Sequence, residues 1–119
     1  MHRFRELKVY QKALQFTKRV RKETKLFPKE ELFVLTSQFR RAADSIILNI
    51  AEGSGNTSKK EFARFLDYSI RSGYECNGCL DIALVLEYLS SRTHQELFLQ
   101  VDEIIAMLVG LQKFQKVSR

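Results

Sequence analysis

The chain has 119 residues, 45% of them hydrophobic and 29% charged, which suits one domain with an apolar core, expected over residues 1–119. Its twenty Lys and Arg outnumber fourteen Asp and Glu, and its five glycines and one proline exclude a collagen-like or disordered chain. No uncharged apolar run approaches the roughly 20 residues of a membrane span, and the N-terminal charges lack the apolar stretch of a signal peptide. We therefore expect a cytoplasmic protein without a membrane partner.

The first helix is expected over residues 5–26 and is strongly basic on one side. Its buried stripe, at helical spacing, consists of Val9, Ala13, Phe16, Val20 and Thr24. Residues 1–29 hold ten Lys and Arg against two Glu, and most of these cations gather on the opposite face. The predicted basic face consists of Lys8, Lys12, Lys18, Arg19, Lys22 and Lys25. Such asymmetry favours an anionic partner, above all RNA or DNA, although a solvated face without a partner has the same pattern.

A second helix is expected over residues 29–52. Pro28 suits its first turn, and Gly53 is expected to end it in a left-handed conformation. The predicted buried stripe consists of Leu32, Leu35, Phe39, Ala42, Ala43, Ile46 and Ile50. Asn49 lies at the edge of this stripe, where its amide can bond to a neighbouring helix. We assign Asn49, Glu52 and Gly53 a structural role.

A third helix is expected over residues 59–89 and a fourth from Thr93 onwards. Ser58 with Glu61, and Thr93 with Glu96, have the spacing of capping boxes. The third helix has a core stripe with small residues in its middle, made of Phe62, Phe65, Leu66, Ser69, Gly73, Cys76, Leu80, Ala83 and Leu84. The fourth has a coiled-coil-like repeat of Leu97, Val101, Ile104, Leu108 and Leu111. Short connections make successive helices antiparallel, which predicts an all-α, up-down-up-down four-helix bundle.

A second apolar stripe is expected on another face of the third helix. It consists of Ile70, Tyr74, Val85 and Tyr88. One bundle core is not expected to cover both stripes of this helix. Because extended apolar patches usually mark contacts between proteins, we predict that these four residues pack between the subunits of a homo-oligomer.

Candidates for catalysis and metal binding are few. Cys76 and Cys79 have C-x-x-C spacing but lie inside a helix with no preceding strand, which favours buried thiols over a redox pair. Neither His2 nor His94 has the spacing of a zinc site, and neither follows a Glu by three residues as in di-metal bundles. We therefore expect no catalytic residue, no metal and no cofactor.

The glycine-rich loop at residues 53–58 precedes Lys59 and Lys60 at a helix N-terminus, where backbone N–H groups can hold a phosphate. Its residue order and the helix before it do not fit a P-loop, which favours an ordinary turn between two helices. Lys59 and Lys60 stay as candidate phosphate contacts, and nucleotide hydrolysis is not expected.

Four sequence blocks point to a known family. Two lie in the second helix and the glycine-rich loop after it, LTSQFRRAA (35–43) and SIILNIAEGSG (45–55), and two lie elsewhere, FRELKVYQKA (4–13) and SKKEFARFL (58–66). These blocks closely resemble the bacterial 23S rRNA intervening-sequence protein family. The resemblance implies a four-helix bundle that assembles into a ring-shaped homopentamer and has no established enzymatic activity. The accessory protein of diversity-generating retroelements is similar in architecture, which implies, by analogy alone, nucleic acid and a reverse transcriptase as partners.

The chain departs from the family pattern at Arg71 and Glu87, where the family commonly has glycine, and we expect a looser helix approach at both.

Three functions compete. A non-enzymatic bundle that binds nucleic acid without sequence preference is favoured by the basic face and the family analogy. A purely structural or protein-interaction bundle is the alternative. A nuclease that acts on rRNA insertions has no support among the residues.

Overall fold

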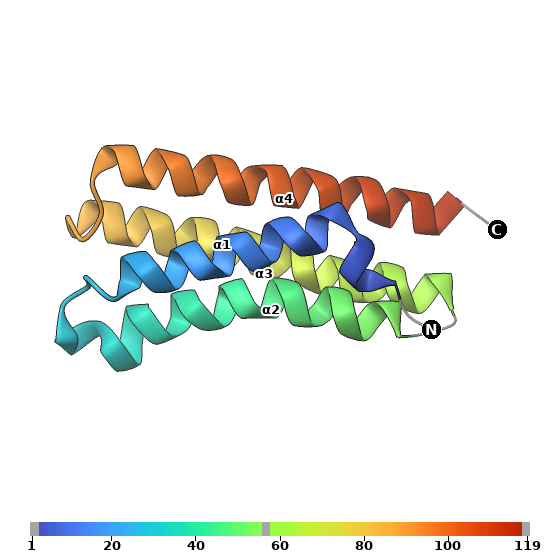
Figure 1. Cartoon of the computed structure of the whole chain (residues 1–119), viewed down its shortest axis with the longest axis horizontal. Helices are drawn as coiled ribbons and strands as arrows, with labels where there is room; N and C mark the ends of the chain where they lie inside the picture. The colour runs from blue at the N-terminus through green and yellow to red at the C-terminus, as the bar shows by residue number, and fades with distance from the viewer. Residues whose placement is uncertain (1–2, 56–57, 118–119) are drawn as a thin grey trace.

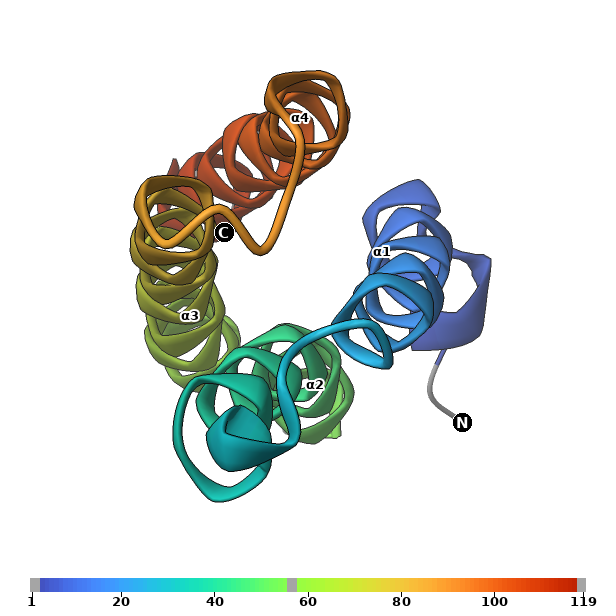
Figure 2. The ribbon, with the colours of Figure 1, turned by 90° about the vertical axis from the view of Figure 1, so that its left-hand side faces the viewer.

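The computed structural model describes residues 3–55 and 58–117, and this described part is helical, with short connections and no strand. The four long helices are α1 (Lys8–Thr24), α2 (Ser37–Ser54), α3 (Lys59–Val85) and α4 (Ser91–Val117). Successive helices run antiparallel along a body of 48 × 23 × 20 Å, and α1 packs between α2 and α4 (Figures 1 and 2). The predicted all-α, up-down-up-down four-helix bundle is confirmed.

The core of the bundle is built by the predicted stripes. In α1 every predicted position is buried, namely Val9, Ala13, Phe16, Val20 and Thr24. Side chains less than 2% exposed include Phe16 of α1, Phe39 of α2, Leu66 of α3 and Leu97 of α4. The rings of Phe16 and Phe39 meet edge to face, with centroids 6.5 Å apart. Burial of each such side chain contributes roughly 1.5–3 kcal/mol, so apolar packing holds the four helices together.

Gly53 lies at a close approach of α2 to α3. A Cβ atom added at Gly53 would lie 2.5 Å from the Cβ of Phe65. No described glycine has a positive φ, and α2 continues through Gly53 to Ser54. The prediction that Gly53 ends the helix in a left-handed conformation is therefore wrong, because this position needs space and not an unusual backbone. Gly73, among the small residues of the predicted stripe, lies at a close approach of α3 to α4, where a Cβ would lie 2.7 Å from Cγ1 of Ile105.

Gly53→Ala should lower the free energy of unfolding by about 1–3 kcal/mol, the usual effect of overpacking a core. The added methyl group meets the Cβ of Phe65, which no side-chain rotation can move away. Gly110→Ala is the matched control, because a Cβ there has no neighbour within 4 Å. Alanine should stabilise the helix at that position by about 1 kcal/mol. Urea denaturation compares the variants, and wild-type stability of Gly53→Ala would contradict the close approach.

The segment between α1 and α2 departs from the single helix predicted over residues 29–52. A 3-10 turn covers Lys29–Glu31, a π-helical turn covers Leu32–Thr36, and α2 begins only at Ser37. A π-helical turn contains more residues than an α-helical one, so it changes which side chains face the core. The predicted start of the α-helix at residue 29 is therefore wrong, because a 3-10 turn and a π-helical turn precede α2.

The side chain of Glu31 stabilises the start of this π-helical turn. Its Oε1 accepts a hydrogen bond from the backbone N–H of Leu35 at 3.3 Å. Within the turn Leu35 and Thr36 are buried. Three apolar side chains instead face solvent, namely Leu32, Phe33 and Val34. The prediction that Leu32 belongs to the buried stripe is wrong for this reason.

The end of α3 lies earlier in the chain than predicted. The helix ends at Val85 and not at residue 89, because Glu87 has a positive φ of 63° and the N–H of Tyr88 donates to the carbonyl of Ala83 at 2.8 Å. Glycine is favoured at this position because its backbone adopts the left-handed conformation without strain. Close packing of two helices is not the reason. The Arg71 side chain is 73% exposed and pairs with Asp67. The expected loosening of helix approach at both residues is therefore wrong.

Glu87→Gly should stabilise the fold by up to about 1 kcal/mol. The left-handed conformation costs an L-residue roughly 1–2 kcal/mol, which is partly offset by the greater freedom of glycine in the unfolded chain. Glu87→Ala is the control, since alanine keeps the Cβ that disfavours this conformation. Thermal unfolding should rank the glycine variant above the alanine variant, and the opposite order would refute the role of backbone strain here.

The start of α4 also differs from the prediction. The helix begins at Ser91, and the Oγ of Ser90 accepts a hydrogen bond from the N–H of Thr93 at 3.1 Å. The predicted capping box from Thr93 to Glu96 is therefore wrong, since Ser90 caps the helix and Glu96 instead binds a side chain of α1. At α3 the predicted cap is confirmed, because the Oγ of Ser58 accepts from the N–H of Glu61 at 3.2 Å.

Candidate functional site

The cations predicted on the first helix do not form one uniform face. Four of them are exposed and have no ion-pair partner among the described residues, namely Lys8, Lys18, Lys22 and Lys25. Lys12 instead turns towards α4, where its Nζ lies 3.2 Å from Oε1 of Glu103. The structure therefore separates cations that are available to a ligand from cations that link helices.

Arg19 links α1 to α4. Its guanidinium donates to Glu23 in α1 at 2.9 Å and to Glu96 in α4 at 2.8 Å. The hydrogen bond from Arg19 holds the pKa of Glu96 below its ordinary value, and the same bond is the main cause of a raised pKa for Arg19. Arg19 and Lys12 thus act first as contacts between helices, which spacing within one helix did not reveal.

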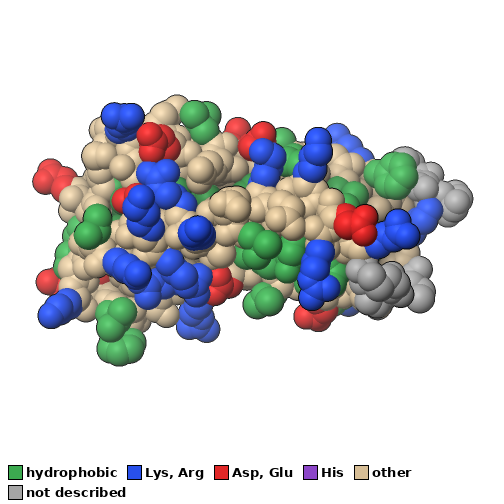
Figure 3. All heavy atoms as spheres, viewed as in Figure 1, with side chains coloured by type: hydrophobic (Ala, Val, Ile, Leu, Met, Phe, Trp, Pro, Cys, Tyr) green, Lys and Arg blue, Asp and Glu red, His purple; other side chains and the backbone are tan. Residues whose placement is uncertain are grey.

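Two neighbouring arginines lie in α2, and the first of them contacts the C-terminal half of α1. Arg40 donates from its Nε to Oγ1 of Thr24 at 2.9 Å, while Arg41 is exposed. With the unpaired lysines of that half they form what we call the α1–α2 basic surface, made of Lys18, Lys22, Lys25, Arg40 and Arg41. Figure 3 shows Lys and Arg side chains gathered over this part of α1 and α2. The sequence analysis missed these arginines because it followed charge along the first helix alone. The two consecutive arginines at positions 40 and 41 were the signal that could have identified them.

Arg21 lies near this surface but its charge is compensated. Its two terminal nitrogens donate to the two carboxylate oxygens of Asp44 in α2, each at 2.7 Å. Thr17 donates to the same carboxylate at 2.6 Å. The hydrogen bond from Arg21 holds the pKa of Asp44 below its ordinary value, against the opposing effect of burial. This bridge holds α1 to α2 and is not available to a ligand.

Lys59 and Lys60 begin α3, at the opposite end of the bundle from the α1–α2 basic surface (Figure 1). They line an open hollow of about 720 Å³ between α3 and α4. Its charged side chains are Lys59, Lys60, Glu61, Arg64, Asp67 and Lys116. Arg64 pairs with Glu61 at 2.7 Å, so this hollow is less basic than its cations suggest. Part of the predicted glycine-rich loop, residues 56–57, lies outside the described residues.

The predicted subunit contact on the third helix is corrected at two of its four positions. Ile70 is only 7% exposed and belongs to the core of the subunit itself. Tyr88 packs against Phe27 with ring centroids 5.4 Å apart, and its hydroxyl donates to Glu31 at 2.8 Å. One bundle therefore covers more of the second stripe than expected. Ile70 is therefore not available to a partner subunit, whereas Tyr88 is partly exposed but already packs and bonds within its own subunit.

The exposed apolar residues on this face of α3 differ from the four that the sequence predicted. Tyr74 is 59% exposed and Val85 78% exposed, and Ile82 between them is 50% exposed. Gly78 lies on the same face, where an added Cβ would meet nothing within 4 Å. We call Tyr74, Gly78, Ile82 and Val85 the α3 outer stripe. Sequence reasoning missed Gly78 and Ile82 because it assumed that the face passed through Ile70.

Asn49 bonds within its own helix. Its Nδ2 donates to the backbone carbonyl of Ser45 at 2.9 Å and to the Ser45 hydroxyl at 3.0 Å. The predicted bond to a neighbouring helix is therefore wrong. The bond between helices is made by Ser72, which donates to Ser45 at 2.9 Å, and by Ser69, which donates to the carbonyl of Ile46 at 2.6 Å. Of the other motif residues, Glu52 is exposed and Gly53 is the close-approach position described above.

The two cysteines are buried thiols, as predicted. Burial raises the pKa of Cys79 to about 11 and raises that of Cys76 further. The His94 ring lies 3.0 Å from Oδ1 of Asp81 and stacks on Phe98.

Across residues 3–55 and 58–117, no three His, Cys, Asp or Glu side chains form a group that could hold a metal ion. In the same ranges, no helix has the length and apolarity that crossing a membrane requires.

Comparison with known proteins identifies the family. The sequence model of the 23S rRNA-intervening sequence proteins matches residues 5–110. A solved structure of a protein with unknown function from the S23 ribosomal protein family of Bacteroides thetaiotaomicron VPI-5482 is similar, with a TM-score of 0.82 and 25% identity. The match covers 88% of this chain and 95% of that one. No curated protein matches. Since the family match spans most of the chain, from the start of the basic helix into α4, this protein belongs to the 23S rRNA-intervening sequence protein family.

Proposed function

We propose that the protein is a non-enzymatic, oligomeric bundle that binds RNA or DNA through the α1–α2 basic surface without sequence preference. The observation that carries this proposal is a group of three exposed lysines with no ion-pair partner among the described residues, Lys18, Lys22 and Lys25. Arg40 and Arg41 extend the group onto α2. Cations of this kind contact phosphates, which position a nucleic acid without reading its sequence.

The dimensions of the surface suit a polyphosphate. The stretch from Lys18 to Lys25 extends about 10 Å along its helix. A duplex carries one negative charge per roughly 1.7 Å of its axis, so one subunit can meet several phosphates. An oligomer would repeat the surface on every subunit and raise the effective affinity further. Lys59 and Lys60 are proposed as weaker phosphate contacts at the other end of the bundle.

The similar structure is that of a protein from a family named S23 ribosomal protein, which agrees with an RNA ligand. The alternative is a structural bundle whose lysines only keep it dissolved. The α3 outer stripe favours self-association under either function, and we propose that a second copy of the chain packs on it. A helical glycine such as Gly78, with open space around it, weakens its own helix by about 1 kcal/mol and suits a close-packed partner helix.

A salt titration tests the nucleic-acid proposal. Fluorescence anisotropy with a labelled RNA hairpin and a DNA duplex of unrelated sequence should give similar affinities at each salt concentration. The logarithm of the binding constant should fall with the logarithm of salt concentration with a slope of about −3 or steeper, since each phosphate contact contributes about −0.9. A flat salt dependence would favour the structural alternative. Cleavage of the RNA with Mg²⁺ present would contradict a non-enzymatic role.

A further inference from the structure

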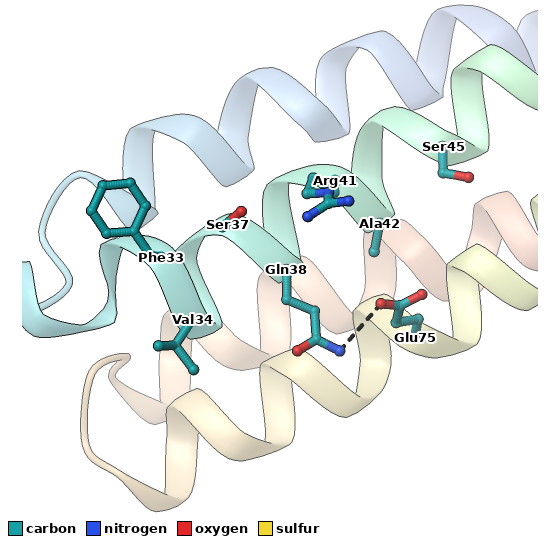
Figure 4. A pocket seen from close by; sticks show the side chains of 8 residues that line it. All are labelled: Phe33, Val34, Ser37, Gln38, Arg41, Ala42, Ser45 and Glu75. Atoms are coloured by element: carbon teal, nitrogen blue, oxygen red, sulfur yellow. Dashed lines mark hydrogen bonds between the residues drawn. The ribbon is translucent and has the colours of Figure 1, made fainter.

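A groove runs along α2 beside α3, next to the α1–α2 basic surface. Its volume is about 630 Å³, and its lining includes Phe33, Val34, Ser37, Gln38, Arg41 and Glu75. Figure 4 shows the apolar Phe33 and Val34 at one end and the polar side chains in a row along α2. The amide of Gln38 donates to Glu75 across the groove at 3.3 Å, as the dashed line in Figure 4 marks.

Phe33 is the least covered of the large apolar side chains that the structure describes. It is 89% exposed, and its neighbour Val34 is 61% exposed. Both lie in the π-helical turn Leu32–Thr36, which faces Leu35 into the core and Phe33 away from it. Short π-helical turns are frequent at functional sites. An aromatic ring open to solvent, in a groove that also contains an arginine, is an arrangement by which proteins stack the bases of single strands.

The groove and the α1–α2 basic surface differ in net charge. Among its described lining residues the groove has one cation, Arg41, and one carboxylate, Glu75, which bonds to Gln38 and forms no ion pair with Arg41. The neighbouring basic surface has an excess of cations, with Lys25 at the end of α1 and Arg40 on α2. A near-neutral groove with an aromatic ring suits an uncharged base, while the basic surface suits the phosphates that connect successive bases. Ser37 and Gln38 offer hydrogen-bonding groups at the base edge.

We propose that this groove binds an unstacked base of single-stranded nucleic acid, with the base on the ring of Phe33 and the strand's phosphates on Arg41 and the α1–α2 basic surface. The proposal rests on the proposed nucleic-acid function and makes it more specific. Bases inside a duplex are already stacked and cannot reach the ring. The basic surface alone binds both forms, so the groove gives the protein a preference for single strands.

The chain contains no tryptophan, which makes Phe33→Trp a direct probe. Titration with oligouridine should quench the fluorescence of this variant, since a stacked base quenches an indole. A duplex of equal length should leave the fluorescence unchanged although it binds. Phe114→Trp is the matched control, because Phe114 is a 59% exposed phenylalanine on α4, away from the groove. Quenching of both variants, or of neither, by bound oligouridine would overturn the proposal.

Affinity measurements distinguish stacking from apolar contact. Phe33→Ala and Phe33→Leu should each weaken oligouridine binding about fivefold or more, while duplex affinity stays within about twofold. Circular dichroism should show an unchanged fold, because the side chain is almost fully exposed. Retained oligouridine affinity in Phe33→Leu would overturn the proposal. Loss of self-association in Phe33→Ala, with oligouridine affinity intact, would identify a second protein chain as the occupant instead.

The same measurements separate this proposal from the function on which it rests. If wild-type protein binds neither oligouridine nor duplex, both are wrong. If wild-type protein binds both and Phe33→Ala binds both equally well, the groove proposal is wrong and the basic surface remains. Only a selective loss of single-strand binding supports the stacking site.

Discussion

Changing Lys18, Lys22 and Lys25 together to Glu should weaken RNA and DNA binding by about two orders of magnitude at low salt and reduce the salt slope by about 3. All three side chains are exposed and have no ion-pair partner in the described ranges, so their replacement should leave folding intact. Lys12 and Arg19 are left unchanged, because they pair with Glu103 and Glu96 of α4. Gel-shift titration and circular dichroism measure the two effects.

A second triple variant controls for net charge. Arg71, Arg92 and Lys113 are exposed cations of α3 and α4, outside the α1–α2 basic surface. Their replacement with Glu changes the net charge by the same amount. This variant should bind nucleic acid several times more tightly than the first triple variant. Equal weakening in both would mean that overall charge, and no defined surface, governs binding.

Tyr74→Glu combined with Val85→Glu should convert the proposed oligomer into monomers. Both side chains are well exposed in the subunit, at 59% and 78%, so helical content should stay that of the wild type. At an apolar contact each new carboxylate loses its water without gaining a partner, which costs several kcal/mol. Multi-angle light scattering gives the mass, for which the family resemblance predicts a wild-type pentamer.

Two further variants test whether the effect belongs to the α3 outer stripe. Leu99→Glu places the same charge on the outer face of α4, at a side chain 56% exposed, and should leave the assembly intact. Ile70→Glu places a charge in the core and should unfold the subunit, because this side chain is 7% exposed. A wild-type monomer, or dissociation by Leu99→Glu as complete as that by the double variant, would end the interface proposal.

Local spacing was enough to predict much of the fold. The stripe from Val9 to Thr24 is buried at every predicted position, because a 3.6-residue period depends only on neighbours in the chain. The same reasoning found the bundle, the cap at Ser58 and the buried Cys76 and Cys79. It failed at Leu32, where a π-helical turn changes the period, and at Glu87, where the backbone ends the helix early.

The candidate site depended on which helices become neighbours, and spacing within one helix carries no information about that. Lys12 and Arg19 share a face with Lys22 in the sequence, yet carboxylates of α4 pair with the first two and leave the third exposed. Arg40 joins the basic surface only because α2 packs against α1, which brings its Nε to Thr24. Ile70 is buried because α3 packs against both α2 and α4. These two helices together cover a wider part of its surface than a single apolar stripe. Periodicity thus sets which face of each helix is apolar, whereas contacts between distant segments decide which charges and apolar groups remain for a partner.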